Sequence, residues 1–383
     1  MKIALFHNLP FGGAKRATYE LIKILSNNHD IDLYLNDMKT ESFLGLSKYT
    51  SNTYSFDYSF DFKISLLNKF YKFISLFFSS LKISSKINNS NYDVALVMQC
   101  HAFNSPLLLR YLKIPVLYYC QEPLTKLLEP HYNNAKFFKK LYINTLIKMD
   151  KKSSFFPTVI AANSMYSVEN IYRSYGRYPK LNYLGVNTSL FKPNLTIKKD
   201  NSIILVGSLN SSKGQDFVIQ SVATMKVKPT VKFIYNFSYG DKDYLNKLKL
   251  DSKKFGINMV LINMASDEDL VKEYNKSKLT VFTSRLEPLG LVPLESMACG
   301  TPVIGVSEGG IRETINNNIN GITTERDPVL FGKAITKLIS DKDLWDLYRD
   351  AGLKSVREKW TWESSTHVLE SNLNLAVDTF NKN

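Results

Sequence analysis

The sequence predicts an α/β protein built from two parallel-sheet units, and three observations support this prediction. Short apolar runs alternate with longer amphipathic spacers, a pattern typical of strands separated by helices. The alternation occurs as two series, which a polar, proline-containing stretch from Asn187 to Asn201 separates. The length of 383 residues is also that of about two ordinary domains.

The first series begins with a strand over Lys2–His7, a turn at Gly12 and Gly13, and a helix from Ala14 to about Leu25. Its later strands are expected over Val94–Met98, Val116–Tyr119 and Thr158–Ala162. The strands of the second series are expected over Ile203–Val206, Val231–Tyr235, Met259–Ile262, Leu279–Phe282 and Pro302–Val306. The predicted domains are residues 1–187 and 188–360, and residues 361–383 are expected to form a helix that crosses back to the first domain.

The composition is that of a globular protein, with 44% hydrophobic and 22% charged residues. The apolar run from Met1 to His7 is too short for a signal peptide. Cys100, Cys120 and Cys299 lack the spacing of a metal site, and they fit a reducing compartment better than a disulfide framework. We therefore expect a cytoplasmic protein.

The net charge of +14 is unevenly distributed along the chain. Residues 1–190 contain 23 Lys and Arg against 12 Asp and Glu, whereas the remainder contains 26 against 23. The first half would therefore meet any anionic partner, such as the inner face of a membrane. Compositional drift in a lysine-rich chain is the alternative explanation.

Residues 64–83 form the most amphipathic segment of the chain, with apolar side chains at helical spacing and three lysines. The lysines argue against a membrane-spanning helix. A helix that packs on the first sheet is the favoured interpretation, and a helix in the plane of a membrane is the alternative.

The most informative motif contains two glutamates, Glu287 and Glu295, after the strand expected over Leu279–Phe282. Gly290 breaks the chain, a helix is expected over Leu291–Ala298, and another strand follows. This βαβ unit places backbone N–H groups and a helix N-terminus at the carboxyl edge of a parallel sheet, where a diphosphate binds well. The two carboxylates then accept hydrogen bonds from sugar hydroxyls beside that anion.

A second phosphate-type motif runs from Val206 to Gly214, between a strand and a helix expected from about Gln215. Its glycines bring the backbone close to a ligand, and Lys213 supplies a point charge for phosphate oxygens. The motif alone is weak evidence, since a surface lysine in a turn is common. The Glu287–Glu295 segment in the same domain reinforces it.

Taken in order, these motifs resemble the retaining glycosyltransferases of the GT-B fold, group 1, family 4. The resemblance covers most of the chain and rests on the following segments: Gly12-Gly13, Ala162-Asn163-Ser164, Leu184-Gly185-Val186-Asn187, Gly207 to Gly214, Glu287 to Glu295, Ala298 to Ile304, Glu308 to Glu313, and Asn320-Gly321. It implies two Rossmann-like domains that face a central cleft. The first domain would bind the acceptor and the second a nucleotide sugar.

The resemblance also implies roles for individual residues. Glu287 would meet hydroxyls of the donor sugar, Glu295 the ribose, and Lys213 the diphosphate. The rest of the implied donor site comprises Gly207, Ser208, Gly290, Leu291 and Val292, and the implied acceptor and phosphate loop comprises Gly12, Gly13 and Gln121. A metal ion and a cofactor are not expected, because Lys213 and helix N-termini would replace a divalent cation at the diphosphate.

Two positions depart from the family pattern. Ser208 stands where most relatives have an arginine, whose charge Arg285 or Lys213 is expected to supply, and Gln121 stands where relatives often have a histidine. Gln121 cannot shuttle a proton at neutral pH. Of the remaining histidines near strand ends, His101 is favoured over His7 as a catalytic acid or base.

The expected function is transfer of a hexose-type sugar from a GDP- or UDP-sugar to a hydroxyl of a saccharide or lipid-linked acceptor, in glycan or cell-surface polysaccharide biosynthesis. A sugar-nucleotide epimerase or phosphorylase on the same fold is one alternative. A basic nucleic-acid-binding module is another, which the run from Lys136 to Lys140 would fit locally, but no nucleic-acid motif accompanies it.

Overall fold

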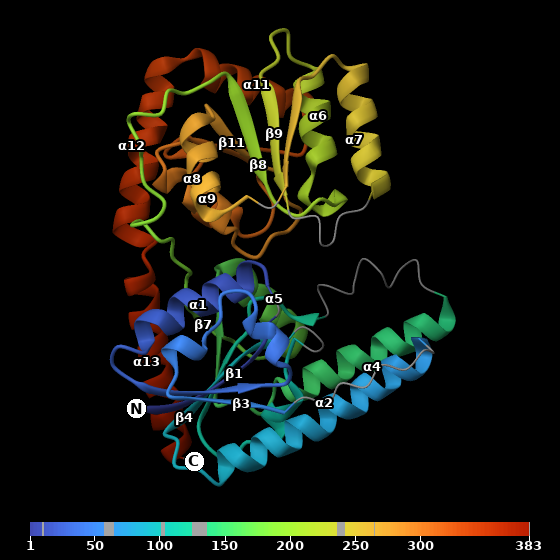
Figure 1. Ribbon diagram of the computed structural model, residues 1–383, viewed down its shortest axis with the longest axis vertical. Coiled ribbons are helices and arrows are strands. Elements are labelled where there is room, and N and C mark those ends of the chain that lie inside the picture. The colour runs from blue at the N-terminus through green and yellow to red at the C-terminus, as the bar shows by residue number, and fades with distance from the viewer. Residues whose placement is uncertain are drawn as a thin grey trace. The chain divides into compact units, whose positions relative to one another are not determined.

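The computed structural model describes residues 1–9, 11–56, 65–100, 104–124, 136–235, 242–263 and 265–382, and the chain divides into two compact units (Figure 1). Unit 1 comprises Met1–Leu184 together with Trp362–Asn383, and unit 2 comprises Gly185–Thr361. The division between Leu184 and Gly185 lies close to the predicted boundary after residue 187. Within unit 2, the Val186 N–H donates to the Trp360 carbonyl at 2.9 Å, and this bond holds the two ends of the unit side by side.

Unit 1 contains a parallel sheet in the order β3-β2-β1-β4-β5-β6-β7 among the described residues. Its strands are β1 (Lys2–Asn8), β2 (Asp30–Leu35), β3 (Asn52–Ser55), β4 (Val94–Cys100), β5 (Val116–Tyr119), β6 (Val159–Ala162) and β7 (Lys180–Leu181). The central strands are apolar and buried on both faces, as parallel strands between helices must be.

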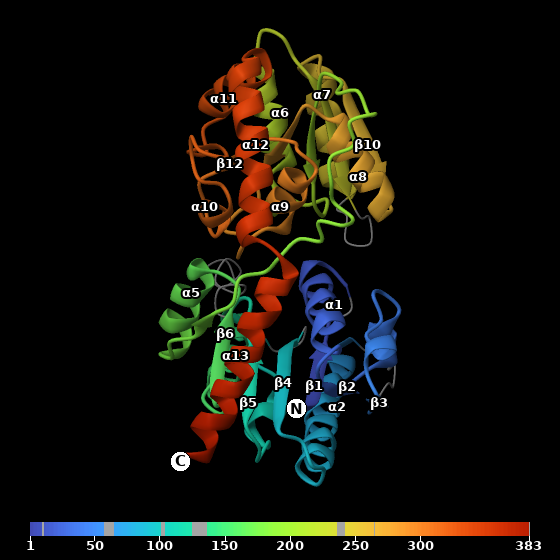
Figure 2. The same cartoon turned by 90° about the vertical axis from the view of Figure 1, so that its left-hand side faces the viewer.

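The helices of unit 1 cover both faces of this sheet. They are α1 (Gly13–Leu25), α2 (Ser65–Asn88), α4 (Phe137–Ser153), α5 (Met165–Tyr175) and α13 (Trp362–Asn381), with short 3₁₀ turns η1 (Met38–Glu41), η2 (Ser47–Tyr49) and η3 (Leu107–Arg110). Figure 2 shows α13 running along β4, β5 and β6, and this helix also packs on α1. On the other face, Ala4, Phe6 and Val97 join the end of α2 in one buried core.

Unit 2 contains a second parallel sheet, in the order β10-β9-β8-β11-β12-β13 among the described residues. The strands are β8 (Ser202–Val206), β9 (Thr230–Tyr235), β10 (Met259–Asn263), β11 (Leu279–Phe282), β12 (Val303–Val306) and β13 (Gly321–Thr324). The helical elements are η4 (Ser211–Lys213), α6 (Gln215–Ala223), α7 (Lys242–Lys254), α8 (Asp267–Lys276), α9 (Leu291–Ala298), α10 (Ile311–Thr314), α11 (Pro328–Ser340) and α12 (Lys342–Lys359). Its main core lies between the sheet and α6, α7 and α11.

The predicted two-unit α/β architecture is confirmed, and each predicted strand is found within one or two residues of its expected ends. Residues 65–83 of the amphipathic segment belong to α2, and Ile83 and Ile87 near the end of this helix are buried in the unit 1 core. Residue 64 lies outside the described residues. Among the helices that the structure describes, none has the length and apolar composition needed to cross a bilayer.

Candidate functional site

The loop between β11 and α9 presents a helix N-terminus at the carboxyl edge of the unit 2 sheet. Gly290 is the N-cap of α9 with a φ of 83°, and it has no side chain to cap the first turn. A Cβ at this position would lie 2.9 Å from Cζ of Phe282, so only glycine fits. The N–H groups at the start of α9, at Leu291 and Val292, are thus left to an external acceptor such as an anion.

The loop after β8 brings a lysine to the same strand end. Gly214 adopts a φ of 75°, and a Cβ there would lie 2.8 Å from the Thr283 carbonyl oxygen, directly after β11. The Thr283 hydroxyl donates to the Lys213 carbonyl at 2.8 Å and holds the two loops together. A Cβ at Gly207 would lie 3.3 Å from Cγ of Lys213, so glycine lets the lysine stem lie against the backbone.

Lys213 and Glu287, predicted from separate motifs, form an ion pair. The Lys213 ammonium donates to Oε2 of Glu287 at 2.6 Å, and the two side chains are 23% and 28% exposed. A diphosphate at Lys213 and a sugar at Glu287 would therefore be adjacent groups of one ligand. Leu286, the residue before Glu287, has a φ of 50°, which is strained for a leucine and shows that this loop is held in a specific conformation.

Glu295 lies one turn into α9 and is only 7% exposed. Its Oε2 accepts a hydrogen bond from the Tyr274 hydroxyl at 2.9 Å. Burial fixes the direction of this carboxylate, which suits a residue that has to meet ribose hydroxyls. Tyr274 supports it from α8, a role that the sequence motifs did not reveal.

An arginine that sequence reasoning missed stands at the same sheet edge. Nε and one terminal nitrogen of Arg326 contact the two oxygens of Glu308 at 2.7 and 2.8 Å, and the same terminal nitrogen donates to the Thr283 carbonyl at 3.0 Å. The hydrogen bonds from Arg326 lower the pKa of Glu308. Arg285 is exposed, whereas Arg326 is held in place by Glu308 and the Thr283 carbonyl.

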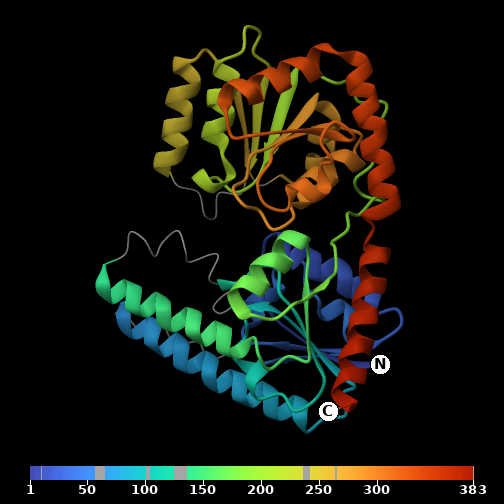
Figure 3. The ribbon, with the colours of Figure 1, turned by 180° about the vertical axis from the view of Figure 1, so that it is seen from behind.

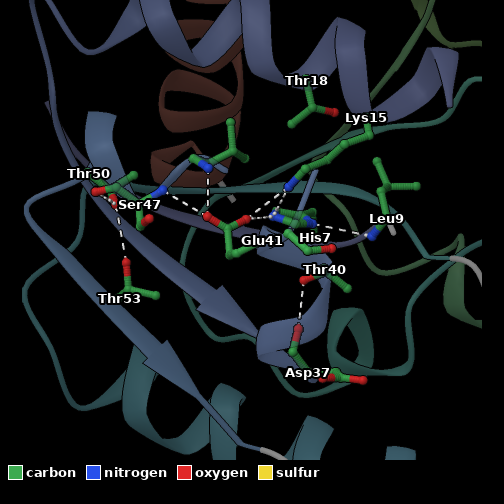
Figure 4. Close-up of polar contacts among 12 residues, drawn as sticks. His7, Leu9, Lys15, Thr18, Asp37, Thr40, Glu41, Ser47, Thr50 and Thr53 are labelled. Atoms are coloured by element: carbon green, nitrogen blue, oxygen red, sulfur yellow. Dashed lines mark hydrogen bonds and ion pairs between the residues drawn. The ribbon is translucent and has the colours of Figure 1, made fainter. Parts of the chain in front are cut away.

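The glycine loop of unit 1 joins β1 to α1 and lies beside a buried polar cluster, shown in Figure 4. His7 and Lys15 are fully buried, and Glu41 reaches them from η1. The Lys15 ammonium donates to Oε1 of Glu41 at 2.9 Å and lies 3.1 Å from Nε2 of His7. The second Glu41 oxygen accepts from the N–H groups of Leu46 and Ser47 at 2.6 and 2.9 Å.

The protonation states of this cluster follow from its geometry. Burial lowers the pKa of His7 to about 4, so its imidazole is neutral at pH 7. Nδ1 lies 3.3 Å from the Leu9 nitrogen, and Nε2 lies 3.3 Å from Oε1 of Glu41 and 3.1 Å from Nζ of Lys15. Burial raises the pKa of Glu41, but hydrogen bonds from His7 and Lys15 outweigh it and lower the pKa to about 2. His7 is therefore a satisfied buried residue and not a proton shuttle.

Helix α1 begins at Gly13, one residue before the predicted start at Ala14, and its N-cap Gly12 has a φ of 94°. A Cβ at either glycine would meet nothing within 4 Å, which leaves this loop open to an approaching ligand. Lys15 follows in the first turn of α1, where a cation opposes the helix dipole. This unfavourable position of Lys15 was the sequence signal available for the buried cluster. Its partner Glu41 could not be predicted from the spacing of the residues.

Gln121 follows β5 at the carboxyl edge of the unit 1 sheet. Its N–H donates to Oε1 of Gln99 at 3.1 Å and its carbonyl accepts from Ser167 Oγ at 2.6 Å. Its side-chain nitrogen is buried with no hydrogen-bond partner, so this donor is left available to a ligand. His101, the predicted acid or base, lies outside the described residues.

Unit 2 contains all of the predicted donor residues, which are Gly207, Ser208, Lys213, Glu287, Gly290, Leu291, Val292 and Glu295. The predicted acceptor and phosphate-loop residues Gly12, Gly13 and Gln121 belong to unit 1. Within unit 2, direct contacts link Lys213, Thr283 and Glu287. Ser208 is tied to the start of α6, because Gln215 Nε2 donates to its carbonyl at 2.8 Å. Among the described residues, no three His, Cys, Asp or Glu side chains are placed to hold a metal ion together.

Comparison with known proteins points to one family. Residues 187–354 match the model of the glycosyl transferases group 1. An uncharacterized glycosyltransferase of Methanocaldococcus jannaschii is 29% identical over 178 residues, which are 45% of this chain and 45% of that protein. The alpha-1,3/1,6-mannosyltransferase of Rhizomucor pusillus is 23% identical over 353 residues, or 80% of this chain and 76% of the relative.

Solved structures show the same fold over nearly the whole chain. HepE of Anabaena, in complex with UDP-glucose, superposes with a TM-score of 0.77 at 18% identity, covering 98% of this chain and 99% of that one. Sucrose-phosphate synthase of Thermosynechococcus elongatus also has a TM-score of 0.77 at 18% identity, covering 97% and 98%. The second unit therefore contains a region of the group 1 glycosyl transferases, and the chain as a whole has the GT-B fold.

Proposed function

We propose that the protein is a retaining hexosyltransferase that uses a GDP- or UDP-sugar and a hydroxyl of a saccharide or lipid-linked acceptor. The observation that supports this most directly is the contact of Lys213 with Glu287 at one sheet edge, beside the start of α9. The Lys213 ammonium suits a diphosphate, and the Glu287 carboxylate suits sugar hydroxyls. Glu295, one turn further, suits the ribose of the nucleotide.

In the proposed reaction, the bond between the anomeric carbon and the diphosphate oxygen breaks, and a bond from that carbon to the acceptor oxygen forms on the same face. The acceptor proton passes to an oxygen of the departing diphosphate. Lys213 and the first N–H groups of α9 stabilise the negative charge that develops there. Charge stabilisation by these groups makes a divalent ion unnecessary in this scheme.

Two of the similar proteins support the substrate class, since one is named as a mannosyltransferase and the other contains UDP-glucose. The basic first half of the chain supports an acceptor at an anionic membrane surface, in glycan or cell-surface polysaccharide synthesis. His101, which follows β4, is retained as a candidate acid or base. Gln121 is proposed to donate a hydrogen bond and not a proton.

The direct test is a thermal-shift panel of UDP-, GDP- and ADP-sugars, followed by product analysis. One nucleotide should raise the melting temperature, because a ligand that binds the folded state stabilises it. Transfer with retained anomeric configuration, unaffected by EDTA, is the expected result. Isomerised donor without acceptor would indicate an epimerase, and a sugar phosphate formed from inorganic phosphate would indicate a phosphorylase. Failure of all three donors to bind would refute the proposed site.

A further inference from the structure

Arg326 closes a ring of hydrogen bonds around the Lys213–Glu287 pair, and the proposed reaction gives it no part. Its side chain follows β13 and is 14% exposed. The guanidinium contacts two neighbouring loops, through both oxygens of Glu308 after β12 and through the carbonyl of Thr283 after β11. Figures 1 and 3 show these loops, in orange, at one end of the unit 2 sheet. A single side chain therefore holds the starts of both loops.

One branch of the ring leads from Arg326 to the lysine proposed for the diphosphate. The Thr283 hydroxyl donates to the Lys213 carbonyl at 2.8 Å and lies 3.2 Å from the carbonyl of Gly214. The guanidinium also lies over the ring of Phe217 in α6, with Cζ 5.2 Å from the ring centroid. Because α6 begins directly after Gly214, the guanidinium holds the Lys213 turn from two sides.

The other branch leads through Glu308 to Glu287. Two residues after Glu308, the Gly310 N–H donates to the Glu287 carbonyl at 2.9 Å. A Cβ at Gly310 would lie 1.9 Å from the carbonyl oxygen of Pro288, so the two loops are closely packed here. The Lys213 ammonium donates to Oε2 of Glu287 at 2.6 Å and completes the ring. Each of these bonds joins two different loops, so a shift of any one loop breaks a bond.

The loop inside the ring has a conformation that needs outside support. Leu286 has a φ of 50°, which is strained for a leucine. Such strain persists only where the surrounding contacts over-determine the backbone. Arg326 supplies two of these contacts, one at Thr283, where the loop begins, and one at Glu308, whose own loop packs on its end. Without the guanidinium, the loop is free to relax.

We propose that Arg326 is a positioning residue, which holds the Lys213 ammonium and the Glu287 carboxylate in the arrangement that a nucleotide sugar needs. This inference rests on the proposed function, which assigns the diphosphate to Lys213 and the sugar hydroxyls to Glu287. Arg326 acts through these two groups and does not itself touch the donor. Arginine suits this role because its planar fork presents several N–H donors in a fixed geometry, which lysine cannot reproduce.

Direct binding of the diphosphate by the guanidinium is the alternative, and the geometry disfavours it. Two nitrogens of Arg326 already donate to Glu308 and Thr283. The third, Nη1, meets no hydrogen-bond acceptor among the residues that the structure describes, but it is buried. Hydrogen bonds from Arg326 also lower the pKa of Glu308, so an ionised carboxylate neutralises the guanidinium at pH 7. A phosphate cannot reach this cation unless the pair opens.

The first experiment examines the loops without a ligand. Amide hydrogen exchange of the full chain reports on the N–H groups of Arg285 and Gly310, which donate to the carbonyls of Ser212 and Glu287 at 2.8 and 2.9 Å. Arg326→Gln should accelerate exchange at both amides about tenfold and leave the amides of the unit 2 strands as they are. Unchanged exchange at both amides would overturn the proposal, whether or not the protein binds a nucleotide.

The second experiment compares nucleoside diphosphates with the matching monophosphates, as UDP with UMP and GDP with GMP, by calorimetry. Arg326→Gln should weaken diphosphate binding about tenfold, because a displaced Lys213 loses a charge-assisted hydrogen bond. The kcat for the sugar donor should fall at least as much, since misplacement of a group that stabilises developing charge slows the reaction. Binding of the monophosphate should be unchanged, because Glu295 lies outside the ring.

Two further variants make the test decisive. Arg326→Lys keeps the charge without the fork, so it should lose as much diphosphate affinity as Arg326→Gln. The matched control is Arg177→Gln in unit 1, which removes an arginine held by the carbonyls of Ser154, Pro157 and Thr158 and should bind both nucleotides as the parent does. The proposal is overturned if Arg326→Lys restores diphosphate binding, if monophosphate binding falls equally, or if the control loses as much. A parent that binds no nucleotide would refute the donor site, and hydrogen exchange would still decide the role of Arg326.

Discussion

At the scale of single residues, the charged pairs of the two units differ in their exposure to solvent. Lys213 and Glu287 are partly exposed and stand where a ligand can reach them. Lys15 and Glu41 are buried and satisfied by protein groups, so they hold the loop beside them in place. Exposure to solvent, and not residue type, is what distinguishes the two pairs.

The exposed pair leads to a prediction about catalysis. Lys213→Met should lower kcat by about 10²- to 10³-fold, because one preorganised donor to a developing negative charge is lost. The free energy of unfolding should change by only about 0–1 kcal/mol, since the Lys213–Glu287 pair is screened by solvent. Steady-state kinetics and urea unfolding measure the two effects. Lys249→Met on α7 is the control, and an unchanged kcat for Lys213→Met would contradict the assignment.

The buried cluster leads to a prediction about pH. The pKa of His7 is lowered from 6.5 to about 4 in the folded protein, so the unfolded chain binds a proton at a higher pH than the folded one. Stability is therefore full above pH 6.5 and falls as pH decreases toward 4, by roughly 3 kcal/mol in total. The pKa of Glu41, at about 2, acts in a separate and more acidic window.

Urea unfolding in steps between these pH values measures the His7 effect. The variant His7→Gln should remove most of the pH dependence while lowering stability at neutral pH. His367→Gln, at an exposed position on α13, is the control and should keep the parental slope. An equal slope for His7→Gln and the parent would show that the dependence comes from other groups.

At the scale of elements, strand positions could be predicted better than side-chain partners. The run Leu279–Phe282 is apolar and uninterrupted, and it forms β11 with the predicted ends. Strand β2 was not predicted, because Asp30 and Asp32 interrupt the apolar run that is typical of a buried strand. Asp32 is buried and accepts from the Tyr92 hydroxyl at 2.6 Å and the Asn52 side chain at 2.8 Å. Such long-range compensation cannot be read from local composition.

The same limit applies to the candidate site. The glycine turns at Gly207, Gly214 and Gly290 could be predicted because their flanking strands and helices are local signals. The Arg326–Glu308 pair could not, since it joins two loops through side-chain geometry alone. Ser208 shows the reverse case, because its departure from the family pattern was visible in the sequence, but the additional cation Arg326 at this sheet edge was not.

Close packing of two loops gives a prediction at this scale. Gly310 precedes α10, and a Cβ there would lie 1.9 Å from the Pro288 carbonyl oxygen. Gly310→Ala should therefore displace the 286–290 loop, lower stability by about 1–3 kcal/mol and reduce the thermal shift by the donor nucleotide. Gly256→Ala is the control, since its Cβ meets nothing within 4 Å and only its φ of 61° is strained. Equal donor binding by Gly310→Ala and the parent would contradict the prediction.

At the scale of the whole molecule, the chain enters unit 2 at Gly185 and leaves it at Thr361, so unit 1 is built from both ends of the sequence. Helix α13 completes the unit 1 core with Leu369, Leu373 and Ala376, each fully buried. His29 adds a 2.9 Å contact from unit 1 to Glu370 on the same helix. Unit 2 has its own core and does not depend on this helix.

Removal of residues 362–383 should therefore unfold unit 1 and spare unit 2. Each fully buried apolar side chain contributes roughly 1.5–3 kcal/mol, so the several lost with α13 amount to about the whole stability of a domain. Limited proteolysis of the truncated chain should leave a resistant fragment that begins near Gly185, and this fragment should still bind the donor nucleotide. Val368→Ser in the full chain, at a position 38% exposed, is the control and should leave both units protected. If unit 1 of the truncated chain resisted proteolysis as well as the parent, α13 would be an accessory helix and not part of the core.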